Sequence, residues 1–236
     1  MDLKGIEMTW LGHATFRFRF GDGTTVIIDP WLESNPACPP AEHSQERVDA
    51  IFVTHGHFDH MADAEPLATA HGAPVFAIHE VAVYLEMQGV ENVVGLNKGG
   101  TVAGPGGMRG TMVDAVHSGG ISGPDGIIPG GTPAGWILAF PDGPRVYHAG
   151  DTMVFGDMSL IGELFSPDIA LLPIGGHYVM DPPQAAHAAQ LLGVKAVVPM
   201  HYGTFPILAG TPSELADALN GTGIETADLT IGEPVV

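Results

Sequence analysis

The chain has 236 residues, with eight lysines and arginines against 27 aspartates and glutamates, so its formal net charge is −19. This length fits one domain with a full core, and no apolar run is long enough to cross a bilayer. Such an acidic surface repels polyanions and disfavours nucleic-acid binding and nuclease activity. Solubility or adaptation to salt explains the acidity better than an acidic patch for a basic partner.

The expected compartment is the cytoplasm. The first residues contain no positively charged segment followed by an apolar one, so no secretory signal is expected. Cys38 is the only cysteine, which excludes an intrachain disulfide. It lies in a proline-rich loop without a neighbouring histidine and is interpreted as dispensable for metal binding and catalysis. We expect no membrane partner, and the formation of a homo-oligomer is left open.

Three strands are expected at the start of the chain, over residues 6–11, 14–20 and 25–29. The second alternates, with Phe16 and Phe18 on one face and Arg17 and Arg19 on the other. The glycines around Asp22 predict the hairpin turn that follows it.

Helices are expected over residues 61–71, 79–88, 156–165, 182–192 and 212–220. Glycines that favour a helix end follow four of them, namely Gly72, Gly89, Gly193 and Gly221. Thr211 and Glu214 match a capping box at the start of the last helix. Helices and strands alternate in both halves of the chain, which excludes all-α and all-β folds.

Three segments do not follow these patterns. The glycine-rich stretch 99–107 is interpreted as a hinge between two halves of a single domain, residues 1–236, and not as a linker. Residues 31–46 and 117–132 are expected to be irregular. The second of these is rich in glycine, and long loops of this kind are often functional. Because it begins at His117, a candidate metal ligand, we interpret it as a rim over a metal site that becomes ordered when substrate binds.

A dense cluster of metal-binding side chains follows the apolar run 50–53. His55 and His57 point to the same side of extended backbone and can hold one cation together. Asp59 and His60 follow directly and can reach a second cation. Imidazole and carboxylate ligands suit zinc, manganese or iron, so this motif predicts a metal site.

The other ligands are sought where a histidine or aspartate follows an apolar strand. His117, Asp151 and His201 each occupy such a position. Sites in open α/β sheets form at the carboxyl ends of strands, so these side chains are expected to lie near His55.

The order His-x-His-x-Asp-His, a lone His, Ala-Gly-Asp-Thr and a final His resembles the metallo-β-lactamase superfamily. The flanking motifs Trp-Leu-Gly-His-Ala at 10–14 and Met-His-Tyr-Gly at 200–203 are most similar to its small stand-alone metal-dependent hydrolases, among them the ascorbate-6-phosphate lactonases. The resemblance covers nearly the whole chain and implies a four-layer αββα sandwich, an α/β fold.

Two divalent transition metals per chain are implied by this resemblance, with zinc as first choice and manganese or iron as alternatives. The implied ligands of the first metal are His55, His57 and His117. Those of the second are Asp59, His60 and His201, and Asp151 would bridge the two. The flavin-linked oxygen-reducing relatives carry a glutamate where this chain has His57, which argues for hydrolysis. The reaction implied is attack by a metal-bridging hydroxide on a small ester, lactone or phosphodiester.

Catalytic and supporting roles at this implied centre are assigned from the positions of the residues in the sequence. Asp59 and Asp151 are predicted catalytic residues, and His177, at another strand end, is a third that contacts substrate or donates a proton to the leaving group. A structural role in its loop is the alternative for His177. Asp29 is the best candidate to hold the second nitrogen of a ligand histidine. For His13, an approach to the metals or the substrate and a buried structural role are equally weighted.

The substrate is expected to be a small molecule. No motif loop contains a lysine or arginine, and Lys98 and Arg109 are the nearest in sequence, so a phosphorylated lactone requires another way to hold its phosphate. The alternatives are a phosphodiesterase and, from another class, a metal-binding or regulatory protein without turnover. The complete second ligand set argues against the latter.

Overall fold

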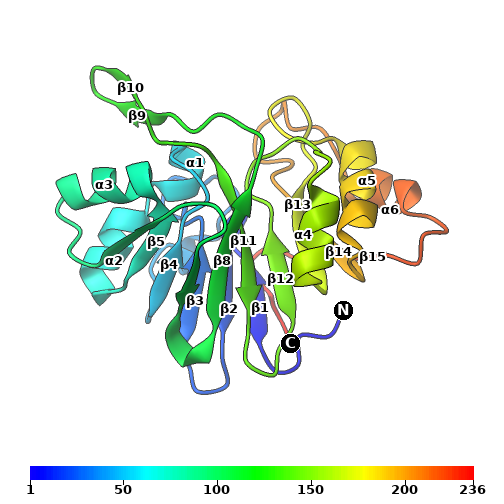
Figure 1. The fold of residues 1–236 in the computed structure, drawn as a ribbon, viewed down its shortest axis with the longest axis horizontal. Helices are drawn as coiled ribbons and strands as arrows, with labels where there is room; N and C mark the ends of the chain where they lie inside the picture. Colours follow the sequence, from blue (N-terminus) through cyan, green and yellow to red (C-terminus); the bar gives the residue numbers. More distant parts are fainter.

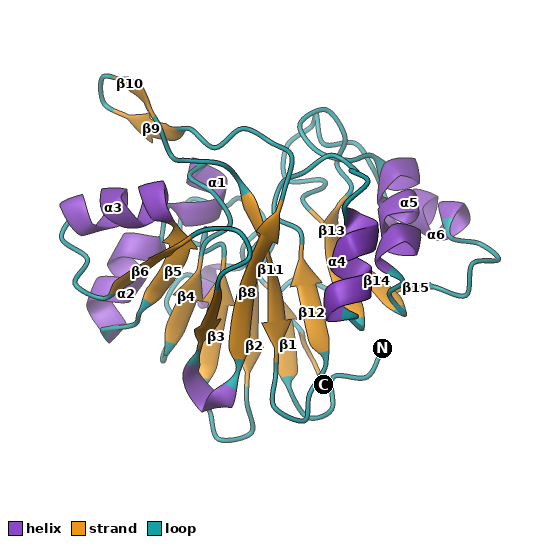
Figure 2. Ribbon diagram, in the orientation of Figure 1, coloured by secondary structure: helices purple, strands orange, loops and turns teal.

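Two seven-stranded sheets lie face to face between two layers of helices in the computed structural model, which describes residues 1–236 (Figures 1 and 2). The first sheet contains, in spatial order, β16 (Pro234–Val235), β1 (Glu7–Trp10), β2 (Phe16–Arg19), β3 (Thr25–Ile28), β4 (Ala50–Phe52), β5 (Val75–Ile78) and β6 (Val93–Leu96). Its strands are antiparallel from β16 to β3 and parallel from β3 to β6.

The second sheet repeats this arrangement. Its spatial order is β15 (Glu225–Thr226), β14 (Ala196–Met200), β13 (Ile169–Pro173), β12 (Arg145–His148), β11 (Ala134–Ala139), β8 (Arg109–Asp114) and β7 (Thr101–Ala103). The strands are parallel from β15 to β12 and antiparallel from β12 to β7. The chain passes from the first sheet to the second between β6 and β7 and returns at its end, where β16 pairs with β1.

Helices cover the outer face of each sheet. The helices α2 (Ala64–His71) and α3 (His79–Met87) pack on the first sheet, and α5 (Pro182–Leu192) packs on the second beside α4 (Met158–Phe165) and α6 (Pro212–Ala218). Figure 2 shows these two sets on opposite sides of the strands. The short helix α1 (Phe58–Met61) lies at the upper edge in Figure 1. Two 3₁₀ turns, Pro40–Glu42 and Pro105–Gly107, complete the elements.

The alternation of side chains along the strands of the second sheet builds two cores. In β8, Met112 belongs to the core that contains the residues of the first sheet. Its neighbour Val113 belongs to the smaller core with α4, α5 and α6. Because successive strand residues point to opposite faces, one sheet packs on both sides. The expected four-layer αββα sandwich is confirmed.

The helix ends follow the predicted signals in most places. Gly72 and Gly193 end α2 and α5 in the left-handed conformation, and Thr211 with Glu214 forms the capping box of α6. The helices α3 and α6 end at Gln88 and Leu219, shortly before the expected Gly89 and Gly221. No glycine was expected after α4, which ends at Ser166 with a φ of 45°. No helix in the chain is both long and apolar enough to cross a membrane.

Two expectations about single elements were wrong. The first helix is two helices, because the chain breaks after Met61 and begins again at Ala64. The segment 117–132 is not wholly irregular, since it contains a hairpin of β9 (Ile121–Gly123) and β10 (Gly126–Ile128). This hairpin projects above α3 in Figure 1.

Candidate metal centre

Four chain segments that leave the carboxyl ends of strands meet at the upper edge of the molecule in Figure 1. The segment after β4 carries His55, His57, Asp59 and His60. The segments after β8, β12 and β14 carry His117, Asp151 and His201. The strands β4, β8, β12 and β14, which come from both sheets, end at this edge, so side chains far apart in sequence are brought together.

Eight side chains form two groups there, and within each group the donor atoms lie within 4.8 Å of one another. The first group contains His55, His57, His117 and Asp151, and the second contains His13, Asp59, His60 and His201. These groups contain all seven residues for which the sequence resemblance implies a metal-binding role. Asp151, expected to bridge the two metals, falls in the first group, and His13 joins the second. The expected donors, nitrogen and oxygen without sulfur, make up both groups.

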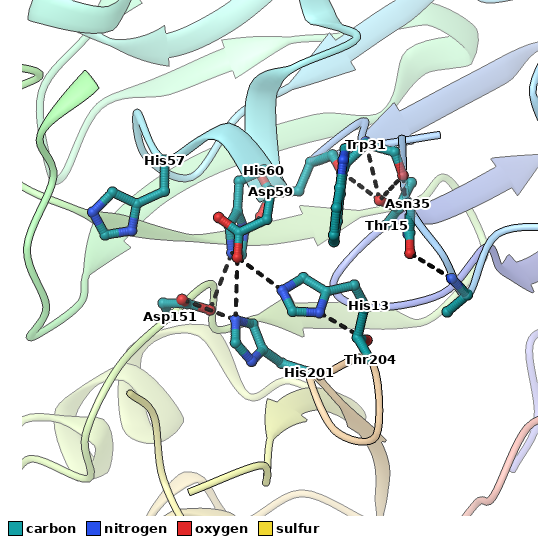
Figure 3. A network of polar contacts seen from close by, with 12 residues as sticks. His13, Thr15, Trp31, Asn35, His57, Asp59, His60, Asp151, His201 and Thr204 are labelled. Carbon is teal, nitrogen blue, oxygen red and sulfur yellow. Dashed lines mark hydrogen bonds and ion pairs between the residues drawn. The ribbon is translucent and has the colours of Figure 1, made fainter. Parts of the chain in front are cut away.

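Asp151 lies between the two groups and contacts both. Its Oδ2 is 3.4 Å from Nε2 of His117 and 3.1 Å from Nε2 of His201. Its Oδ1 is 3.3 Å from Nε2 of His60. Figure 3 shows this carboxylate facing His60 and His201. A carboxylate in this place can share its oxygens between two cations.

Several donor atoms at the centre have no hydrogen-bond partner although they are buried. These are His60 Nε2, Asp151 Oδ1 and both ring nitrogens of His201. Buried polar atoms nearly always have a partner, and a bound cation would supply one here. Nitrogen and oxygen donors of this kind suit zinc, manganese and iron. The residues present therefore fit two divalent cations.

The charges at the centre also favour cations. Burial lowers the pKa values of His55, His57 and His117, so these imidazoles are neutral, the form that binds metals. Burial opposes charge on Asp151 as well, but the charges of His201 and His60 outweigh it and hold its pKa well below the usual range.

The pKa of His60 also indicates that the carboxylates of the centre favour a positive charge there. Burial alone would lower its pKa, but the carboxylates of Asp151, Asp29 and Asp59 outweigh burial and raise the pKa well above its usual value. Three carboxylates around a buried imidazole require a positive charge, which a bound cation would also supply.

A line of hydrogen bonds behind the ligands fixes their orientation. Asp29 Oδ2 is 2.7 Å from Nδ1 of His60 and accepts a hydrogen bond of 2.7 Å from the hydroxyl of Thr54. The same hydroxyl is 2.9 Å from Nδ1 of His55. Asp29 thus occupies the position proposed for it from sequence, while Thr54 was not singled out.

His13 contacts Asp59 directly. Its Nε2 is 3.0 Å from Asp59 Oδ2, and its Nδ1 is 3.0 Å from the hydroxyl of Thr204 (Figure 3). The ring is fully buried, and burial followed by the charge of His201 lowers its pKa to about 4. Of the two roles considered from sequence, the structure shows the approach to the metal groups, in a buried and hydrogen-bonded position.

His148 and Gly150 position the segment that carries Asp151. His148 Nε2 donates to the carbonyl of Ala14 over 2.9 Å, and its Nδ1 accepts from the backbone nitrogen of Gly150 over 3.1 Å. Gly150 has a φ of 60°, and a Cβ there would lie 2.8 Å from that of Thr54. Only glycine lets the two motif segments approach so closely.

His177 and Cys38 lie outside both groups. His177 is exposed, has a φ of 58°, and makes no hydrogen bond or ion pair with the centre; its ring lies 4.4 Å from that of Tyr178. Cys38 is buried, and burial raises the pKa of its thiol to about 12. The structure gives this thiol no contact with either group.

Comparisons with known proteins agree with this geometry. The model of the β-lactamase superfamily domain matches residues 24–202. A UPF0173 metal-dependent hydrolase of Koribacter versatilis is 53% identical over 215 residues, 91% of this chain and 92% of that protein. One of Rubrobacter xylanophilus is 53% identical over 224 residues, 94% and 92% of the two chains.

A solved structure is similar over the same length. It is that of Igni18, a metallo hydrolase of the archaeon Ignicoccus hospitalis, with a TM-score of 0.84 and 38% identity. The match covers 98% of this chain and 97% of that one.

Proposed function

Because the chain belongs to the metallo-β-lactamase superfamily and is a metal-dependent hydrolase, we propose that it uses two divalent metals to hydrolyse a small ester, lactone or phosphodiester. The observation that supports two metals is the position of Asp151, whose carboxylate contacts both groups of donors. A site for one metal needs no second complete group.

Each residue has a part in this proposal. His55, His57 and His117 would hold the first metal, Asp59, His60 and His201 the second, and Asp151 both. When bound, the two metals lower the pKa of a water between them and polarise the substrate oxygen. Zinc is the first choice, with manganese and iron as alternatives for the same donors.

The two carboxylates differ in access to solvent. The side chain of Asp59 is 14% exposed and that of Asp151 only 3%. Asp59 can therefore accept a hydrogen bond from a reacting water or substrate, while Asp151 lies deeper and holds the groups together. His13 keeps one oxygen of Asp59 fixed, which leaves the other free to act.

His177 is proposed to act at the rim. Its exposure favours contact with incoming substrate, and proton donation to the leaving group would require it to move closer to the centre. The partner is a small molecule, since the net charge of −19 opposes nucleic acids. The single cysteine supports the cytoplasm as the proposed compartment.

The test compares Asp151→Ala with His177→Ala and with Asp217→Ala, an exposed helix position, as control. Metal content and turnover of ester, lactone and phosphodiester probes are measured after loading with zinc or manganese. Wild type should hold two metals per chain. Asp151→Ala should lose metal and activity, whereas His177→Ala should keep both metals and lose at most about 10²–10⁴-fold in rate.

Two outcomes would overturn the proposal. One metal in fully loaded wild type would exclude the binuclear centre. Two metals without turnover of any probe would instead support a metal-binding or regulatory protein. If His177→Ala removes metal, that histidine is a ligand and the assignment of the two groups changes.

A further inference from the structure

Resting on the proposed hydrolytic function, we propose that the substrate is an uncharged acyl compound, an ester or lactone, with an aliphatic or aromatic substituent. That substituent would bind to an aromatic wall beside the second metal group, formed by Trp31, Phe58 and Phe205. Phosphorylated compounds would be poor substrates.

Within the aromatic wall, Trp31 contacts both of the other rings. The ring centroid of Trp31 lies 5.6 Å from that of Phe58, edge to face, and 6.0 Å from that of Phe205, nearly parallel. Trp31 is 2% exposed and Phe58 is 52% exposed. The wall thus has a buried floor, Trp31, and an accessible ring, Phe58.

The wall is continuous with the second group. The ring of His13 lies 5.1 Å from Trp31 and 6.0 Å from Phe205, and the same ring contacts Asp59. Figure 3 shows Trp31 beside His13 and Asp59. Phe58 stands between His57 and Asp59 in the sequence. A group bound on the wall therefore lies next to the donors of the second metal.

The other segments that bear ligands also expose apolar side chains. Val116, Met153 and Ile207 are 42%, 51% and 47% exposed and lie close in sequence to His117, Asp151 and His201. Exposed apolar side chains on the segments that carry the ligands suit a substrate with an apolar substituent and a polar reacting bond.

Positive side chains are placed elsewhere. Arg109, Arg145 and Lys195 stand at or just before the starts of β8, β12 and β14, the edge opposite the ligands. Lys98, which is nearer, forms an ion pair with Asp114.

The other four lysines and arginines belong to the half of the chain that forms the first sheet, and they offer no free positive charge to the centre. Arg17 pairs with Glu42, Arg19 with Glu7 and Arg47 with Asp49, while Lys4 precedes the start of β1. No lysine or arginine is therefore free at the centre to pair with a phosphate group on the substrate.

The experiment uses the metal-loaded protein and p-nitrophenyl esters from acetate to octanoate, with bis-p-nitrophenyl phosphate as the charged probe. We expect kcat/KM to rise about threefold per added methylene until the wall is covered. Phe58→Ala and Phe205→Ala should lower the octanoate-to-acetate ratio of kcat/KM at least about tenfold, which corresponds to a few methylenes of lost contact. Leu164→Ala, an exposed apolar position on α4, should leave the ratio unchanged.

Binding of 2-octanone, a neutral ketone that is not hydrolysed, provides a measure independent of turnover. It should quench the fluorescence of Trp31, and Trp31→Phe should remove that change. Preference for the phosphodiester, or an ester ratio that Phe58→Ala does not alter, would overturn the inference while hydrolysis stands. Absence of turnover with every probe would overturn the proposed function. Ketone binding alone would then show whether the aromatic wall binds an apolar substituent.

Discussion

At the scale of single residues, the centre depends on how buried charges are held. Asp29 bonds both His60 and Thr54, and Thr54 in turn reaches His55, so one carboxylate orients ligands of both groups. Asp29 could be proposed from sequence because it ends an apolar strand. The bond between His13 and Thr204 could not, because these residues are 191 positions apart and only the fold brings them together.

We predict that His13→Ala weakens binding of one of the two metals about 10–100-fold, the usual effect of losing a residue that orients a ligand. The reason is that Asp59 loses the partner that fixes its Oδ2. His13→Gln, whose amide can still donate to Asp59, should retain more of the affinity. Metal titration by calorimetry measures the affinity for each of the two metals, with His71→Ala on α2 as control. Equal loss of both metals would show that His13 supports the whole centre.

At the scale of elements, the strands and helices were largely predictable because they follow simple periodicities and end signals. The alternation in β2, the glycines after α2 and α5, and the capping box of α6 are local in sequence. The hairpin β9–β10 was missed because its strands have three residues each and are rich in glycine. It is held by contacts outside itself, since Ile121 packs against Gly56.

We predict that Gly56→Ala displaces the loop 117–132. A Cβ at this position would lie 2.5 Å from Cγ1 of Ile121, closer than real contacts allow. Amide hydrogen exchange in residues 119–131 should therefore become faster, and a second substitution, Ile121→Ala, should make room and partly reverse the change relative to Gly56→Ala alone. Gly21→Ala, with nothing within 4 Å of its Cβ, is the matched control. Unchanged exchange in Gly56→Ala would mean that Ile121 moves freely aside.

At the scale of the whole molecule, the centre joins the two halves of the sandwich. His55, His57, Asp59 and His60 follow a strand of the first sheet, and His117, Asp151 and His201 follow strands of the second. Bound cations would therefore link the sheets to each other at their common edge. The unfolded chain has no such set of donors, so metal binding should stabilise the folded state alone.

We predict that removing the metals lowers the melting temperature. At a free metal concentration of about 100 times Kd, each bound metal contributes about 2.7 kcal/mol. For a domain of this size that corresponds to a shift of about 5–11 °C for each metal. Thermal unfolding with and without a chelator measures it, and Asp151→Ala should show little further shift on chelation. If the chelator left the melting temperature of wild type unchanged, this would contradict the proposal that bound metals link the two halves.

The return of the chain to the first sheet has a consequence for how the protein is made. Because β16 pairs with β1, and the amino group of Met1 is 2.7 Å from a carboxylate oxygen of Glu225, segments from opposite ends of the chain meet. During synthesis on the ribosome, one edge of β1 stays unpaired until β16 has been made, which requires nearly the whole chain. Such edges recruit other chains. Translation speed and chaperone supply should therefore affect the yield of this protein more than a sequential fold of equal size would suggest.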